Sequence, residues 1–165
     1  MQAVAVATKQ MSEPEPRVAA ILQPLQVCEQ LTRELVQSVI DELHALLVEE
    51  GSTEVEKFEA HVAIAQVIRD VTHWSNFEQV EEVLAHFRAA CAMFEQYATK
   101  DSSGAVRSKV ASMFGEQLAR AASHFAFDRQ PLLLSEGESH LRYACLLYTS
   151  PSPRDQRGSR MPSSA

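Results

Sequence analysis

The 165-residue chain carries 22 acidic and 15 basic side chains, which gives a formal net charge of −7 at pH 7. An acidic surface repels the phosphates of nucleic acids and of anionic membranes, so neither is an expected partner. No run approaches the roughly 18 apolar residues of a membrane span, and no basic region with an apolar stretch after it indicates a signal peptide. The sequence therefore predicts a cytoplasmic protein, with Cys28 and Cys91 as buried free thiols on helices.

The N-terminal residues 1–16 are expected to be a disordered lead-in to the folded domain. Pro14 and Pro16 favour extended backbone in this segment. The position of the natural start is open between Met1 and Met11. Met11 opens MSEPEP, an ordinary acidic N-terminus, and the ten residues before it could be upstream sequence translated in frame.

The C-terminal residues 145–165 are expected to be a disordered tail that is foreign to the domain. Two pieces, CLLYTSPSPRD at 145–155 and SRMPSSA at 159–165, resemble the translated adapter of a transposase-based sequencing library, with room for a sample index between them. A Pro/Ser-rich natural tail is the alternative. The resemblance implies that 17–144 is a helical domain truncated at its C-terminus. Without the tail's three arginines and one aspartate, 12 basic and 21 acidic residues remain, a net charge of −9.

A first helix is predicted from Val18 to Glu50, bent or restarted at Pro24. Its apolar residues recur at three- and four-residue spacing, which places them on one face. Gly51 is expected to stop this helix in the left-handed conformation that glycine adopts readily. The residues of the apolar face are Leu25, Cys28, Val36, Val39, Ile40, Leu43, Leu46 and Leu47.

The second predicted helix is the element around which the domain is organised. Thr53 and Glu56 have the spacing of a capping box, in which each side chain accepts a hydrogen bond from a free backbone amide at the helix start. Apolar residues then fill roughly half of the helix circumference, wider than the stripe of a surface helix. Neighbours are therefore expected on both flanks, with Phe58, Val62 and Ile68 in the core.

A tight corner at Trp74 is predicted to end the second helix, and its indole is expected to cover the seam between two helices. Ser75 to Glu78 has the pattern of a second capping box. It opens a third helix from Asn76 to about Ala98, with an aromatic stripe on one face. The expected core residues of this helix are Phe77, Leu84, Phe87 and Phe94.

A fourth helix is predicted after the polar turn at 99–104 and ends near Phe125, with Val110 and Phe114 in the core. Pro131 is expected to interrupt the segment that follows. A capping-box pattern from Ser135 to Glu138 would start a fifth helix that ends around residue 144. Short joining loops force antiparallel neighbours. The predicted fold is all-α: an antiparallel up-and-down bundle, or a short stack of helical hairpins, of four to five helices.

Two Asp/His pairs bear on metal binding. Asp41 and His44, and again Asp70 and His73, stand three residues apart, which places each pair on one helix face. Both pairs project from the polar arc of their helices, whereas metal sites in helical bundles use glutamates and histidines that point inward. No metal site is therefore predicted.

The other histidines give no catalytic prediction either. Glu82 and His86 are interpreted as a surface pair one helical turn apart. His61 lies near an apolar arc and is expected to be a satisfied boundary histidine rather than a general base, because no positioned partner accompanies it. With five glycines there is no phosphate-binding loop, and no nucleophile motif occurs. We expect no catalytic residue, no cofactor and no metal.

The segment from Ile64 to Phe87, IAQVIRDVTHWSNFEQVEEVLAHF, resembles the N-terminal helical region of the beta regulatory subunit of eukaryotic translation initiation factor two-B. The likeness extends over residues ~60–115 and includes a helix that ends in a Trp-Ser-Asn corner. Ser108 and Lys109 depart from the paired arginines of that family. The resemblance implies a non-catalytic subunit of a nucleotide-exchange complex, with other subunits as its protein partners.

Two other function classes remain open from the sequence. The first is a generic helical adaptor or scaffold that presents a groove between hairpins to a partner helix. The second is the helical domain of an enzyme whose active site lies outside this chain. As a regulatory subunit or as an adaptor, the chain would be a non-catalytic module that binds protein.

Overall fold

The computed structural model describes residues 14–28, 32–71, 77–123 and 129–149, and for residues 77, 78 and 149 the backbone alone. All regular structure in these ranges is helical, so the predicted all-α class is confirmed. The helices are α2 (Pro16–Val27), α3 (Arg33–Val48), α4 (Glu54–Val71), α5 (Phe77–Ala92), α6 (Phe94–Tyr97), α7 (Ala105–Ala122) and α8 (Gln130–Thr149).

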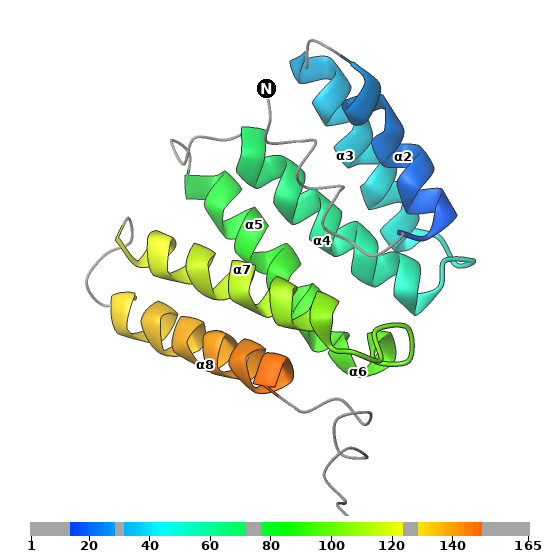
Figure 1. Cartoon of the computed structure of the whole chain (residues 1–165). Coiled ribbons are helices and arrows are strands. Elements are labelled where there is room, and N and C mark those ends of the chain that lie inside the picture. The colour runs from blue at the N-terminus through cyan, green and yellow to red at the C-terminus, as the bar shows by residue number, and fades with distance from the viewer. Residues whose placement is uncertain (1–13, 29–31, 72–76, 124–128, 150–165) are drawn as a thin grey trace, which may run out of the picture.

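The helices form three antiparallel hairpins, α2–α3, α4–α5 and α7–α8, laid beside one another in chain order (Figure 1). Each helix makes its main contacts with its neighbours in sequence, and the short α6 packs on α4 and α5. Of the two arrangements predicted, the structure is closer to a stack of hairpins with two ends than to a closed bundle. A stack leaves one side of its first and last helices open.

The core is continuous along the stack, and α4 is its centre. Almost every side chain of α4 from Phe58 to Ile68 is buried, including polar Glu59 and Gln66, so this helix has neighbours all round. Aromatic rings join the layers: Phe58 stacks on Tyr97 at 4.0 Å between ring centroids. Among the expected core residues, those that the structure describes are all buried: Phe58, Val62, Ile68, Leu84, Phe87, Phe94, Val110 and Phe114. Trp74 and the side chain of Phe77 lie outside the described residues.

The predicted first helix is two helices, and its break is not at Pro24. Pro24 lies inside α2, whereas the chain leaves the helix at Cys28, whose backbone is extended. α3 starts afresh with Thr32 as its N-cap, the threonine Oγ1 accepting from the Leu35 amide at 3.2 Å. The apolar faces of the two helices then pack on each other as a hairpin, which a single straight helix would not allow. Cys28 is exposed, contrary to prediction, and Cys91 is partly buried.

Helix α3 ends without the left-handed glycine that was predicted at Gly51. The described glycine with positive φ is Gly104, at φ 72°, directly before α7. At the end of α3 the Ser52 hydroxyl instead donates to the Leu46 carbonyl at 2.7 Å, and this satisfies one of the free carbonyls of the last turn. The third predicted helix is also divided, at Met93, into α5 and α6.

The last helix starts and ends at other residues than predicted. α8 begins at Gln130, so Pro131 stands in its first turn, where a missing N–H costs nothing. The predicted start at Ser135 is therefore wrong, and Ser135 is an interior residue of α8. The helix also continues to Thr149, so the first residues of the predicted disordered tail, 145–149, are helical. Residues 150–165, with the proposed adapter's remaining part, lie outside the described residues, as do 1–13.

Two glycines bring α7 and α8 close together. A Cβ on Gly115 would come within 2.6 Å of Leu141 Cγ and 3.0 Å of the Gly137 carbonyl oxygen. A Cβ on Gly137 would lie 3.2 Å from the Gly115 carbonyl oxygen. The absence of both side chains therefore sets the distance between these helices. The contact fixes how closely α8 packs on α7.

Candidate functional site

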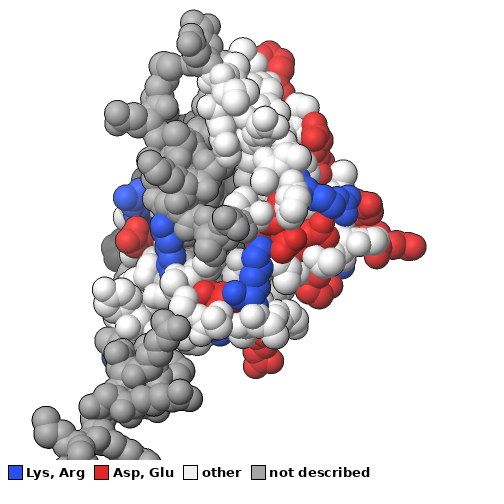
Figure 2. All heavy atoms as spheres, turned by 45° about the vertical axis from the view of Figure 1, so that its right-hand side comes forward, with Lys and Arg blue, Asp and Glu red and all other residues white. Residues whose placement is uncertain are grey.

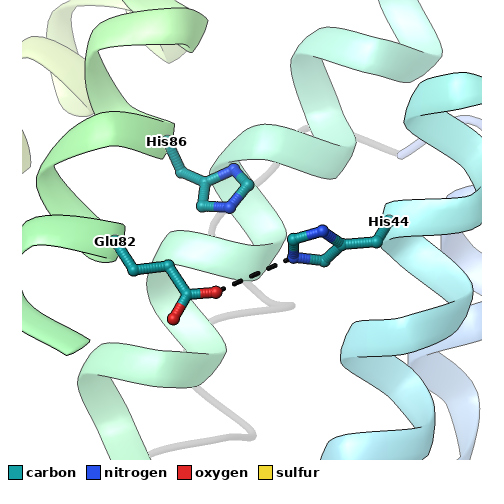
Figure 3. Close-up of side chains that lie close together, drawn as sticks. All are labelled: His44, Glu82 and His86. Carbon is teal, nitrogen blue, oxygen red and sulfur yellow. Dashed lines mark ion pairs between the residues drawn. The ribbon is translucent and has the colours of Figure 1, made fainter. Parts of the chain in front are cut away.

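Three histidines and one glutamate from three helices meet on one side of the stack. Figure 3 shows His44 projecting from α3, and Glu82 and His86 from α5, into the same space. One ligand atom of each of these three residues lies within 4.8 Å of those of the other two. His61, from α4, lies beside them, with its ring centroid 5.1 Å from that of His86. We call His44, His61, Glu82 and His86 the histidine cluster.

Local helix geometry accounts for half of the cluster. Glu82 and His86 are four residues apart on α5, so their side chains lie on one face, one turn from each other. His44 reaches the same place from α3, which flanks α4 on the other side. Its Nε2 lies 3.8 Å from Glu82 Oε1, and the rings of His44 and His86 meet edge to face at 5.2 Å.

The cluster is open at one end and closed at the other. The side chains of His44 and Glu82 are 45% and 44% exposed, whereas His86 is 9% exposed. His86 Nδ1 lies 2.8 Å from His61 Nδ1, a hydrogen bond in which one ring donates and the other accepts. The donor must be assigned from the surroundings, because either tautomer satisfies this contact. The buried end of the cluster is therefore held by a hydrogen bond, whereas the exposed end is joined by the longer His44–Glu82 ion pair and the His44–His86 ring contact.

Burial keeps the two inner histidines neutral at neutral pH. Desolvation, with smaller contributions from His61 and His44, lowers the pKa of His86 to about 4. Desolvation followed by the charge of His44 also lowers the pKa of His61. Neutral imidazole has one nitrogen with an available lone pair, so these rings can accept a proton, a hydrogen bond or a metal ion.

The structure corrects the sequence-based interpretation of Glu82 and His86. They are not a surface pair, because His86 is buried and its partner is His61 rather than Glu82. Asp41, predicted to share a face with His44, accepts a hydrogen bond from Gln37 Nε2 at 2.9 Å. The spacing of Glu82 and His86 was the available signal for this site, but nothing local in the sequence indicates that His44 joins them.

The remaining predicted pair contributes nothing to the cluster. Asp70 pairs with its neighbour Arg69, at 2.8 Å between Oδ1 and Nη2, and His73 lies outside the described residues. The expectation that His61 is a boundary histidine agrees with its partly buried position beside His86.

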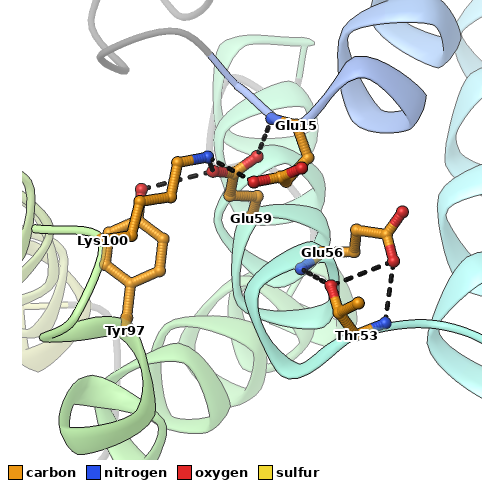
Figure 4. Close-up of polar contacts among 6 residues, drawn as sticks. All are labelled: Glu15, Thr53, Glu56, Glu59, Tyr97 and Lys100. Atoms are coloured by element: carbon orange, nitrogen blue, oxygen red, sulfur yellow. Dashed lines mark hydrogen bonds and ion pairs between the residues drawn. The ribbon is translucent and has the colours of Figure 1, made fainter.

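A second polar cluster surrounds Glu59, which is 0% exposed. Figure 4 shows this carboxylate of α4 among Glu15, Tyr97 and Lys100. Its Oε1 accepts from Lys100 Nζ at 2.7 Å and from the Tyr97 hydroxyl at 3.3 Å, and its Oε2 accepts from the Glu15 backbone amide at 2.6 Å. Lys100 Nζ also pairs with the Glu15 carboxylate at 2.8 Å. Sequence analysis missed this cluster, because no local spacing relates Glu59 to Glu15, Tyr97 or Lys100.

Charge pairing outweighs burial in the Glu59 cluster. Burial alone would lower the pKa of Lys100, but its hydrogen bonds to Glu15 and Glu59 raise it, so the amine stays protonated. Burial, together with the negative charge of Glu59, raises the pKa of Tyr97. Every strong donor in this cluster is thus directed at Glu59, and the cluster ties the start of α2 to α4 and to the turn after α6.

The predicted capping box at the start of α4 is formed. The Thr53 amide donates to Glu56 Oε2 at 2.8 Å, and the Glu56 amide donates to Thr53 Oγ1 at 3.1 Å (Figure 4). The backbone hydrogen bond from Thr53 lowers the pKa of Glu56, and the nearby Arg17 adds to this effect. This glutamate has a structural role, because its acceptor positions serve the helix start.

Comparison of the chain with protein-family models, with curated proteins and with solved structures finds no match. None of the helices described is long and apolar enough to cross a membrane. The surface and the histidine cluster are the features of the structure that bear on function.

Proposed function

We propose that this chain is a non-catalytic helical module that binds a protein partner through exposed apolar side chains of α8. The supporting observation is the distribution of exposed apolar side chains. Of eight large apolar residues exposed in the described ranges, five lie on α8, whereas Val27, Val48 and Val71 are single residues at or near the ends of three other helices. The five are Leu132, Leu134 and Leu141, and then Leu146 and Tyr148 from the segment that resembles an adapter, so the proposal rests on the first three.

Two of these side chains share one face of α8. Leu134 and Leu141 stand seven residues apart, so they form a short apolar stripe along the helix. The stripe borders the side of α8 that packs on α7, where Leu133, Gly137 and Ala144 lie, and Leu141 itself reaches α7 at Gly115. Exposed apolar side chains that gather on one helix are typical of a binding site. The stripe on α8 supports docking of protein there.

The charge of the molecule favours protein over nucleic acid as the partner. Figure 2 shows acidic side chains gathered along the right edge of the face it draws, with lysines and arginines next to some of them. With a net charge of −7, the chain offers no general attraction to a phosphate backbone. An apolar stripe on an acidic helical module fits a partner with an apolar groove and a basic rim.

The finer proposal is that the partner is a subunit of a nucleotide-exchange complex. It rests on the resemblance of residues 64–87 to the regulatory subunit of translation initiation factor two-B. In the structure this segment forms most of the α4–α5 hairpin, with its corner, 72–76, outside the described residues. A generic helical scaffold is the alternative, since a stack of hairpins also serves proteins that bring partners together.

A matched pair of charge substitutions tests the proposal. Leu134→Lys places a charge in the stripe of α8, and Val48→Lys places the same charge at the exposed end of α3. In pull-downs from a eukaryotic extract, we expect wild type and Val48→Lys to capture a defined partner in equal amounts. Leu134→Lys should capture at least tenfold less of it. Initiation-factor subunits in the retained set would favour the regulatory-subunit proposal. Equal capture by both variants, or tight salt-sensitive RNA binding, would overturn the proposal that α8 binds protein.

A further inference from the structure

Three members of the histidine cluster have the donor set of a transition-metal site. Two imidazoles and one carboxylate meet there, with their ligand atoms within 4.8 Å of one another. We propose that His44, Glu82 and His86 bind a divalent transition-metal ion, for which Zn²⁺ is the best match. Two histidines and one glutamate form a known zinc ligand set, in which the fourth position is left to water or to another ligand. This inference is independent of the α8 surface.

The geometry needs a small contraction to hold the ion. Zinc bonds of about 2.0–2.1 Å in a tetrahedral site put neighbouring ligand atoms about 3.3 Å apart. His44 Nε2 and Glu82 Oε1 are already 3.8 Å apart, and both side chains are nearly half exposed. Rotation about their side-chain bonds can therefore close the remaining distance without moving the helices. Figure 3 shows the two side chains directed at each other, with His86 beside them.

The buried end of the cluster supplies the support that a ligating histidine requires. Metal-bound histidines usually donate their other ring N–H to an acceptor, which fixes the tautomer and the orientation of the ring. His86 Nδ1 is 2.8 Å from His61 Nδ1, so His61 can be that acceptor. With its proton on Nδ1, His86 presents the lone pair of Nε2 to the ion. His86 is thus the anchored ligand, and His44 and Glu82 are the mobile ones.

Ligand chemistry selects the class of ion. Imidazole suits Zn²⁺, Cu²⁺, Ni²⁺ and Co²⁺, whereas Mg²⁺ and Ca²⁺ require oxygen ligands. A bound ion would tie α3 to α5 directly, across the helix α4 that separates them. It would therefore link the first hairpin of the stack to the second, and binding to the folded state alone would raise the melting temperature.

The test is a zinc titration of untagged protein after removal of metal with a chelator. Isothermal titration should give one site per chain, and one equivalent of Zn²⁺ should raise the melting temperature while Mg²⁺ does not. His44→Gln and Glu82→Gln should each weaken zinc binding at least tenfold, and both residues are exposed enough for the variants to fold. Glu42→Gln is the matched control: it removes the same charge from the exposed face of α3 and should leave the affinity unchanged.

Cobalt provides a second readout that does not depend on stability. Co²⁺ bound by two imidazoles and a carboxylate in a tetrahedral site should give visible absorption bands, and His44→Gln should remove them. Zinc binding that persists in the His44→Gln/Glu82→Gln double variant would place the ion elsewhere on the chain and would overturn the proposal. Absence of any zinc binding by folded wild-type protein would also overturn it.

Discussion

The two polar clusters of this fold each include a residue of α4, Glu59 in one and His61 in the other, and they differ in how completely their groups are paired. Around Glu59 both carboxylate oxygens accept hydrogen bonds, from a lysine, a tyrosine and a backbone amide. In the histidine cluster one buried contact, between His61 and His86, is complete, whereas His44 and Glu82 face each other at 3.8 Å with acceptor positions unused. A saturated cluster holds the fold together. A cluster with unused lone pairs can accept a ligand.

The largest expected effect comes from the saturated cluster. Glu59→Gln removes the negative charge that Lys100 and Tyr97 are directed at, and breaking a buried charge pair in this way costs roughly 3–5 kcal/mol of unfolding free energy. Urea denaturation followed by circular dichroism measures this loss. Glu54→Gln, at an exposed position of the same helix, is the control and should cost less than about 0.5 kcal/mol. Equal, small losses for both would show that Glu59 is not the centre of a structural cluster.

Acidification should lower the free energy of unfolding through the histidine cluster. The pKa of His86 is about 4 in the folded state, against 6.5 for an ordinary histidine. Between these values the unfolded state binds more protons, so stability falls as the pH drops from about 6.5 to about 4, by about 3 kcal/mol in total. His86→Gln should flatten this part of the stability–pH curve, measured in the presence of chelator. Parallel curves for wild type and variant would contradict the assignment of His86 as a buried neutral histidine.

Tyr97→Phe separates hydrogen bonding from packing within the Glu59 cluster. It removes the hydroxyl that donates to Glu59 at 3.3 Å and keeps the ring that stacks on Phe58. One hydrogen bond of this length should contribute about 1 kcal/mol to the free energy of unfolding. Tyr143→Phe, whose ring stacks on Phe94, is the matched control. No difference between the two variants would mean that Lys100 and the Glu15 amide alone hold the carboxylate.

The smallest effect is expected from the open cluster. Without metal, His44→Gln should change the unfolding free energy by less than about 0.5 kcal/mol, because its side chain is 45% exposed and makes no saturated contact. Chemical denaturation in chelator measures this value. A cost above about 1 kcal/mol would make the histidine cluster a second structural cluster and would remove the contrast with Glu59.

What the sequence determined by itself is the local structure. Helical periodicity identified the all-α class and the central place of α4, and the spacing of Thr53 and Glu56 identified its first turn. These features depend on residues three or four positions apart, whose geometry a helix sets without help from the rest of the chain. Where two local signals competed, the prediction was wrong: Ser135 has the spacing of a helix start, yet α8 begins at Gln130.

Only the tertiary structure decided which distant residues meet. The burial of Glu59, the contact of Gly115 with Gly137, and the arrival of His44 beside Glu82 and His86 depend on how the helices cross and in which order they stack. A sequence of amphipathic helices specifies faces, but many crossings bury the same faces. The choice among them rests on close packing and on the pairing of buried charge, which act between residues far apart in the chain.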